Sequence, residues 1–156
     1  MIKEWKRNTR DDYTLWDDGK KIGDMVIKYW QTSHRAICTI DGRVLNLKRA
    51  GHWKSAIGIY DSNVNNIIIA YPDKWYGSTY IVEYENKEYK LIIRNNPLME
   101  YVIFENGIEI LIYGLVLENE VPRFIVSTSD KSNYFFDFLV WFMFLPFVRE
   151  HFPYDY

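Results

Sequence analysis

The sequence predicts a mainly β protein: a closed antiparallel β-barrel of about eleven to twelve strands around a central hydrophobic C-terminal helix. Two observations lead to this fold class. Residues 13–129 divide into short runs rich in Ile, Val, Tyr, Trp and Thr, with turn residues after roughly every 8 to 12 positions. The stretch that follows, 134–148, is apolar at every position except Asp137.

The turns are predicted from the shortest sequence segments. Asp41-Gly42 and Asn106-Gly107 are typical of tight hairpin turns, whose central residues need positive φ angles. Further turn sequences are expected at 17–19, 61–63, 85–87, 95–97 and 118–120. Together these positions divide the chain into segments of strand length.

About eleven strands lie between the turns. Tyr89, Leu91 and Ile93 alternate with more polar neighbours, which indicates a sheet with one buried face and one mostly wet face. The predicted strands are 13–16, 22–30, 35–40, 43–48, 54–60, 66–71, 78–84, 88–93, 99–104, 108–116 and 122–128, with room for one more at the N-terminus.

The apolar stretch is predicted as a helix from about residue 132 to 150. Its uninterrupted part, 138–148, is about half the length that a membrane span needs, and the whole stretch is too long for an ordinary strand. Polar residues at 129–133 can cap a helix N-terminus, and Pro146 weakens the last turns. Because the helix is apolar on all sides, it must be surrounded by the rest of the protein.

Closure of the sheet follows from the number of strands. An open twisted sheet rarely holds more than about ten strands, and closing it removes the exposed edges. A barrel of this size can accommodate a helix about 10 to 12 Å wide. The main alternative is a two-sheet β-sandwich packed by the helix.

Two strand segments and the terminal helix resemble a known family. Residues 37–47 form a strand, an Asp-Gly turn and a strand, residues 53–61 form a further strand, and the C-terminal helix is long and very hydrophobic. This arrangement, over 22–151, resembles the tubby C-terminal-like fold, and within it the small LURP-one-related proteins. The resemblance implies a closed barrel around a buried helix and no established catalytic centre. In tubby proteins themselves, surface Lys and Arg residues bind phosphoinositide headgroups, but no positions of this sequence match those ligands.

Composition limits the class of protein. The length of 156 residues fits one domain, 1–156, and the net charge of −2 gives no overall attraction to nucleic acid. The first residues contain no apolar signal-peptide core, and Cys38 is the only cysteine, which excludes an internal disulfide. These features favour the cytoplasm and predict no transmembrane span.

The residues that commonly carry chemistry form no catalytic pattern. His34, His52 and His151 lack metal-ligand spacing, and neither a nucleophile elbow nor a phosphate-binding loop is present. The sequence therefore predicts a protein that is not an enzyme and that has no cofactor and no metal. Asp137 is expected at the barrel mouth, hydrogen-bonded to a tyrosine or a backbone group.

The candidate binding residues lie in two loops. Between residues 20 and 54 basic residues outnumber acidic ones, whereas residues 100–130 are mostly acidic, so the two halves of the barrel should differ in sign. The alternative is that these loops are solvated, with their aromatic residues covering the barrel mouth. The candidates are Lys48, Arg49, His52, Trp53 and Lys54 in the first loop and Trp75 and Tyr76 in the second.

Two functions fit these features. The first is a non-enzymatic binding module that recognises a membrane lipid headgroup or a protein through barrel loops. The second is a dedicated protein-binding inhibitor, such as a bacterial immunity protein.

Overall fold

A computed structural model describes residues 2–30, 33–50, 56–74, 77–95, 98–129 and 133–151. Twelve strands precede a single helix in these residues. The strands are β1 (Lys3–Thr9), β2 (Asp12–Asp17), β3 (Lys20–Trp30), β4 (Ser33–Ile40), β5 (Arg43–Ala50), β6 (Ala56–Tyr60), β7 (Asn66–Pro72), β8 (Thr79–Tyr84), β9 (Lys87–Asn95), β10 (Met99–Glu105), β11 (Ile108–Glu118) and β12 (Val121–Thr128), and the helix is α1 (Tyr134–His151).

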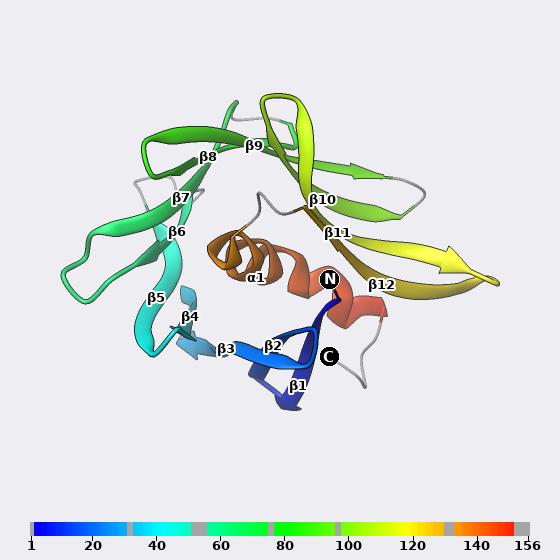
Figure 1. The fold of residues 1–156 in the computed structure, drawn as a ribbon, viewed down its shortest axis with the longest axis horizontal. Helices are drawn as coiled ribbons and strands as arrows, with labels where there is room; N and C mark the ends of the chain where they lie inside the picture. The colour runs from blue at the N-terminus through cyan, green and yellow to red at the C-terminus, as the bar shows by residue number, and fades with distance from the viewer. Residues whose placement is uncertain are drawn as a thin grey trace.

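All twelve strands belong to one sheet in which each strand pairs antiparallel with the next along the chain. Figure 1 shows this sheet curving around α1 as a nearly closed barrel. The predicted barrel around a helix is therefore confirmed, and the sandwich alternative is not observed. The additional N-terminal strand that the sequence left room for is β1.

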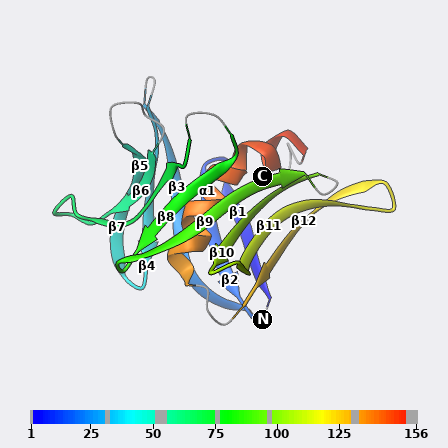
Figure 2. The ribbon, with the colours of Figure 1, turned by 90° about the horizontal axis from the view of Figure 1, so that it is seen from above.

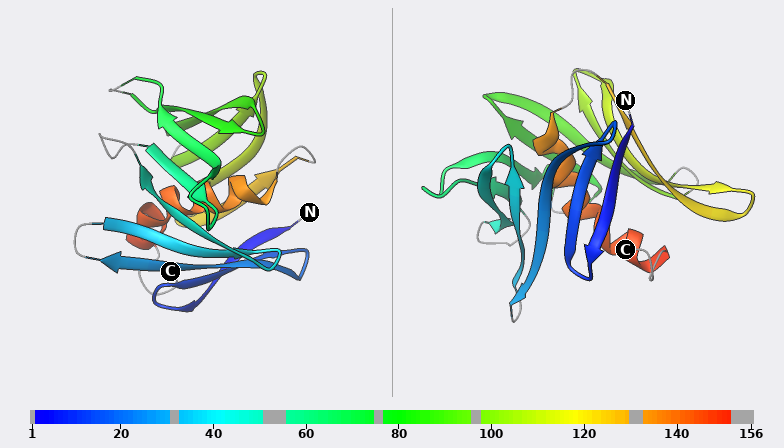
Figure 3. Two further views of the ribbon diagram at one scale, coloured as in Figure 1. Left: turned by 90° about the vertical axis from the view of Figure 1, so that its left-hand side faces the viewer. Right: turned by 60° about the horizontal axis from the view of Figure 1, so that its bottom comes forward.

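The barrel nearly closes between β1 and β12. The Lys3 side chain on β1 reaches the last residue of β12, where its Nζ lies 3.2 Å from the Thr128 hydroxyl. From this point the two strands diverge, and the C-terminal part of α1 lies in the opening between them (Figure 3). We call the end of the barrel at Tyr134, where α1 begins, the proximal end, and the end at His151, where α1 finishes, the distal end.

The helix begins and ends with favourable electrostatics. The Asn133 side-chain oxygen accepts hydrogen bonds from the backbone N–H groups of Phe135 (3.0 Å) and Phe136 (3.3 Å), which caps the first turn. Asp137 lies in the first turn and Arg149 in the last, so each charge complements the helix dipole. The helix continues through Pro146 to His151, close to the predicted end.

The core is the space between α1 and the inner face of the sheet. The Trp5 ring of β1 stacks on Trp141 of α1 at a centroid distance of 5.1 Å, and Tyr101 of β10 packs edge-on against Phe144 at 5.2 Å. Aromatic rings from opposite walls thus meet on one helix. The fully buried helix residues include Phe136, Phe138, Leu139, Val140, Trp141, Phe144 and Val148.

The hairpin turns follow the predicted turn chemistry. Asp41 and Gly42 have φ angles of 51° and 75°, and Asn106 and Gly107 have 50° and 80°. These are the left-handed conformations that the Asp-Gly and Asn-Gly pairs favour. Because the strands alternate in direction, the turns after β2, β4, β6, β8 and β10 lie at the proximal end, and the other connections lie at the distal end.

Candidate functional site

Two of the predicted binding residues lie near the end of β5, at the distal end of the barrel. These are Lys48, which is half-buried, and Arg49, which is exposed. The other five predicted residues, His52, Trp53, Lys54, Trp75 and Tyr76, lie outside the described residues. The described strands that flank both predicted loops meet the distal end: β5 and β7 finish there, and β6 and β8 start there.

The strand register adds two cations to Lys48. Lys28 of β3 lies directly opposite Arg35 of β4, and Arg35 lies directly opposite Lys48 of β5. We call these three residues the cationic row. Their chain neighbours Ile27, Ala36 and Leu47 are buried in the core, so the row lies on the outer face of the sheet.

This arrangement is electrostatically unfavourable for the free protein. Like charges at directly opposite positions of a sheet destabilise it. In the part of the chain that the structure describes, none of the three cations forms an ion pair. The positive charge of the row is therefore available to an anionic group from outside the molecule.

An aromatic ring supports one end of the row. The Lys48 Nζ lies 5.2 Å from the centroid of the Tyr60 ring, within the range of a cation–π interaction. Tyr60 lies over Gly58, where an added Cβ would be 3.0 Å from the ring. Gly58 thus leaves room for the ring, and the ring holds the Lys48 stem against the barrel.

Next to the row, the outer face of the same strands is partly apolar. Ile37 of β4 is 36% exposed and Val44 of β5 is 63% exposed. Ile37 lies opposite Asn46, and Val44 lies opposite Thr39, so these side chains share the outer face. Exposed apolar residues beside unpaired cations are the composition of a contact surface.

Arg49 has a different orientation from the row. It lies opposite Ile57, which is buried, so it belongs to the inner side of the sheet at the distal end. Burial raises the pKa of Tyr101, and the positive charge of Arg49 opposes this shift. Lys48 and Arg49 are neighbours in the predicted site, but the sheet separates their side chains onto its two faces.

Sequence reasoning missed Lys28 and Arg35 as members of the site. Each is one basic residue within a strand, and only the pairing of β3, β4 and β5 shows that they are aligned. The same outer row continues from Lys48 through Gly58 and Ile69 to Glu83 and Glu88. Along this one row, the charge thus changes from positive on β3–β5 to negative on β8–β9.

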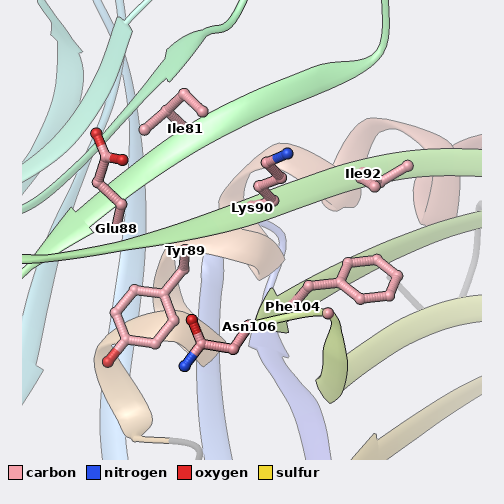
Figure 4. A pocket seen from close by; sticks show the side chains of 8 residues that line it. Ile81, Glu88, Tyr89, Lys90, Ile92, Phe104 and Asn106 are labelled. Carbon is pink, nitrogen blue, oxygen red and sulfur yellow. The ribbon is translucent and has the colours of Figure 1, made fainter.

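A shallow groove of about 480 Å³ lies on the outer face of β8 to β10 (Figure 4). Its wall is formed by Ile81, Lys90 and Phe104, which are neighbours across the three strands. Glu88, Tyr89 and Asn106 lie toward one end. The described residues that line the groove include one carboxylate and one ammonium among apolar side chains, and none of these residues is a histidine, cysteine or serine that could act as a nucleophile or a base.

The most buried polar group belongs to the core. Asp137 accepts a hydrogen bond from the Tyr113 hydroxyl (2.7 Å) and pairs with the Lys3 ammonium (2.8 Å). Burial raises the pKa of Asp137, and the Lys3 charge opposes this shift. The predicted tyrosine partner is confirmed, and Asp137 is fully buried. A substrate has no access to it, so its role is structural.

Two further features are absent from the described residues. Among them, no group of three or more His, Cys, Asp and Glu residues is arranged to hold a metal ion. In the same part of the chain, no helix has both the length and the apolar character that a membrane crossing requires.

Comparison with protein-family models, with curated proteins and with solved structures finds no match for this chain. The resemblance to the tubby C-terminal-like fold stays a prediction.

Proposed function

We propose that this protein is a non-enzymatic binding module that holds an acidic partner protein against the outer wall of β3, β4 and β5. The observation that supports this is the cationic row, in which Lys28, Arg35 and Lys48 lie side by side without a counter-charge in the described residues. Natural sheets seldom keep like charges opposite one another without a compensating gain. Binding of an anionic surface compensates for this electrostatic repulsion.

The spacing of the row fits carboxylates on a folded protein. Adjacent strands are about 4.8 Å apart, so Lys28 and Lys48 are separated by roughly 10 Å at the backbone. Carboxylates three or four residues apart on a helix lie about 5 to 6 Å from each other. An acidic helix laid across the three strands can therefore pair with each cation in turn.

The neighbouring side chains favour a protein over a membrane surface. Protein interfaces combine an apolar centre with a charged rim. Ile37 and Val44 supply exposed apolar area beside the cations on one continuous wall of rigid strands. Opposite charges across such a surface accelerate association and select against basic partners.

Affinity capture from the source cells tests the proposal. The bait is the full chain, in its natural form and with Lys28→Glu, Arg35→Glu and Lys48→Glu combined. The matched control is Lys20→Glu, Arg43→Glu and Lys87→Glu, which changes the same residue types and the same net charge at exposed proximal positions. We expect the natural chain and the control to retain one stoichiometric acidic protein, and the row variant to lose it.

Three results would contradict the proposal. Equal capture by the row variant and the control would remove the row from the interface, and recovery of no stoichiometric partner would remove the protein–protein function. Flotation with anionic vesicles is the third measurement. If the natural chain floats and the row variant does not, the anionic partner is a membrane headgroup and not a protein.

A further inference from the structure

The groove on the outer face of β8, β9 and β10 has an apolar wall. Figure 2 views these three strands from outside the barrel, with α1 behind them. Ile81 of β8, Ile92 of β9 and Phe104 of β10 line the groove, and each of them is half-buried. Because the wet face of an antiparallel sheet is usually polar, three apolar side chains around one hollow form a surface suited to an apolar group.

A buried valine shows that this part of the outer face is packed. Tyr101 and Ile103 belong to the core inside the barrel, so Val102 between them faces outward. Val102 is nevertheless 0% exposed, and its cross-strand neighbours are Ile92 on β9 and Ile112 on β11. Its burial requires cover from these outward-facing neighbours. The wall of the groove is therefore part of a small apolar cluster outside the barrel.

Two side chains of opposite charge lie beside this apolar wall. Figure 4 shows Glu88, Lys90 and Ile92 in this order along β9. Alternate residues of a strand face the same side and lie about 7 Å apart, so a carboxylate, an ammonium and an apolar group follow one another on the outer face. Among the described residues, neither Glu88 nor Lys90 takes part in an ion pair. Both charges are therefore available to a ligand.

The carboxylate of Glu88 lies beside a second carboxylate. Glu88 is directly opposite Glu83 of β8, and Glu83 accepts a hydrogen bond from the Tyr71 hydroxyl at 2.8 Å. Like charges at directly opposite positions destabilise a sheet. An ammonium group bound at Glu88 offsets this repulsion.

Polar features border the groove at both ends along the strands. At the proximal end the groove reaches the turn Asn106-Gly107. Farther along the outer face of β9, Arg94 pairs with Glu100 of β10 at 2.8 Å and with Glu109 of β11 at 2.9 Å. The volume of about 480 Å³ lies within the range of small-molecule sites. The groove is therefore suited to a small molecule, and less to an extended chain that runs along the strands.

We propose that this groove binds a free amino acid with a large apolar side chain. The ligand carboxylate pairs with the Lys90 ammonium, and the ligand ammonium pairs with the Glu88 carboxylate. The ligand side chain lies against Ile92 and Phe104. A zwitterion uses both charges of the groove, whereas a simple anion is repelled by Glu88 and a simple cation by Lys90. This site is separate from the cationic row, and it does not depend on the function proposed for that row.

A series of matched ligands tests the proposal on the unaltered protein. The probe is L-phenylalanine, and its binding is followed through the backbone amide shifts of β8, β9 and β10 in NMR spectra. 3-Phenylpropionate lacks the ammonium, L-phenylalaninamide lacks the carboxylate, and L-alanine lacks the ring. We expect saturable binding of L-phenylalanine with a Kd of about 1–10 mM. Each of the other three ligands should bind about threefold more weakly, or weaker still.

Two variants assign the ligand charges to their partners. Lys90→Met removes the ammonium, so it should weaken L-phenylalanine binding about three- to fivefold and abolish the preference over L-phenylalaninamide. Glu88→Gln should likewise abolish the preference over 3-phenylpropionate. The matched control combines Glu85→Gln and Lys87→Met, at exposed positions that are not among the described residues lining this groove, and it should bind as the natural protein does. The amide spectra check that every variant folds, and the ligand series decides the question if one does not.

The inference would be overturned by any of three outcomes. Absence of a saturable shift in β8, β9 and β10 up to about 20 mM L-phenylalanine would remove the site. Binding of 3-phenylpropionate or L-phenylalaninamide as tight as that of L-phenylalanine would show that the groove does not recognise a zwitterion. Equal affinity of Lys90→Met, Glu88→Gln and the control variant for L-phenylalanine would place the ligand away from these two charges.

Discussion

The ammonium of Lys3, on the first strand, lies 2.8 Å from the carboxylate of Asp137 in the first turn of the helix, and both side chains are buried. Asp137 also accepts from the Tyr113 hydroxyl, which in turn accepts from the Trp5 indole N–H at 2.8 Å. One fully enclosed network therefore connects β1, β11 and α1 at the place where the barrel closes.

Removing Lys3 should cost more stability than removing both charges of the pair. Lys3→Met leaves Asp137 buried without its counter-charge, and we expect a loss of about 3–5 kcal/mol in the free energy of unfolding. In Lys3→Met combined with Asp137→Asn, the amide oxygen still accepts from Tyr113 and no charge is buried. Urea denaturation should show the double variant to be more stable than the single one, and the reverse order would refute this role for the pair.

The Lys3→Met variant should also depend on pH. Without Lys3, burial raises the pKa of Asp137 further above its usual value, so the folded state binds this proton more tightly than the unfolded state. The contribution of this proton to the free energy of unfolding is then complete below the usual aspartate pKa of about 4, and it is lost as pH rises through the folded-state pKa. We expect the loss of unfolding free energy in Lys3→Met, relative to the natural protein, to grow from acidic to neutral pH. A deficit that is independent of pH would contradict this.

Changing Gly23 or Gly114 of the sheet to alanine should reduce stability by different amounts. A Cβ at Gly23 would collide with the backbone carbonyl of Thr39 and lie 3.0 Å from Phe138 of the helix. At Gly114 it would meet the Cγ of the Glu100 side chain at 2.9 Å, with no backbone atom closer than 3.7 Å. Overpacking costs about 1–3 kcal/mol, so Gly23→Ala should fall at the upper end and Gly114→Ala lower. Thermal unfolding of the two variants side by side gives the order.

Cys38 should report on opening of the barrel. Its side chain is fully buried in the core, and burial raises the pKa of the thiol far above the ordinary range. Because the thiolate is the reactive species, a thiol reagent should label Cys38 only when the protein unfolds. The labelling rate in dilute urea should follow the unfolding equilibrium. Rapid labelling under native conditions would show that this part of the core opens locally.

Alkaline pH should destabilise the fold through its buried tyrosines. Burial, with a further contribution from the Asp137 charge, raises the pKa of Tyr113 well above its ordinary value of 10. The folded state then holds this proton more tightly, so its contribution to stability is complete below about pH 10 and is lost above it. Urea midpoints between about pH 8 and pH 11 should fall less steeply for Tyr113→Phe than for the natural protein.

Tyr71→Phe is the matched control for this slope. Its hydrogen bond to Glu83, followed by burial, raises the pKa of Tyr71 to about 12, but the pair lies at the surface, where solvent screens it. We expect Tyr71→Phe to change the slope less than Tyr113→Phe. If the urea midpoints of Tyr71→Phe and Tyr113→Phe depended equally on pH, the loss of stability at alkaline pH would not come from the buried Tyr113.

The parts of the fold that could be predicted are those with a local cause. Asp41-Gly42 and Asn106-Gly107 specify their turns because few other residue pairs adopt those φ angles easily. The apolar stretch around Trp141 had to be buried on all sides, and one sheet of consecutive strands was the available cover. Both inferences needed only short segments of sequence.

The parts that could not be predicted depend on partners that lie far apart in the sequence. Lys3 is one of several charged residues in 3–7, and nothing local distinguishes it as the buried one, because its partner Asp137 is 134 positions away. The alignment of Lys28, Arg35 and Lys48 likewise depends on register across three strands. A shift of one residue in any strand would move a cation to the other face.

The position of α1 after the twelve strands has a consequence for synthesis. Each strand pairs with its predecessor, so hairpins can form as soon as they leave the ribosome, but their inner faces have nothing to pack against. The helix that covers them, Tyr134–His151, is translated after all twelve strands. A nascent chain that lacks it exposes a broad apolar sheet surface, so the barrel gains its core only in a late step, and until then its chain is a substrate for chaperones.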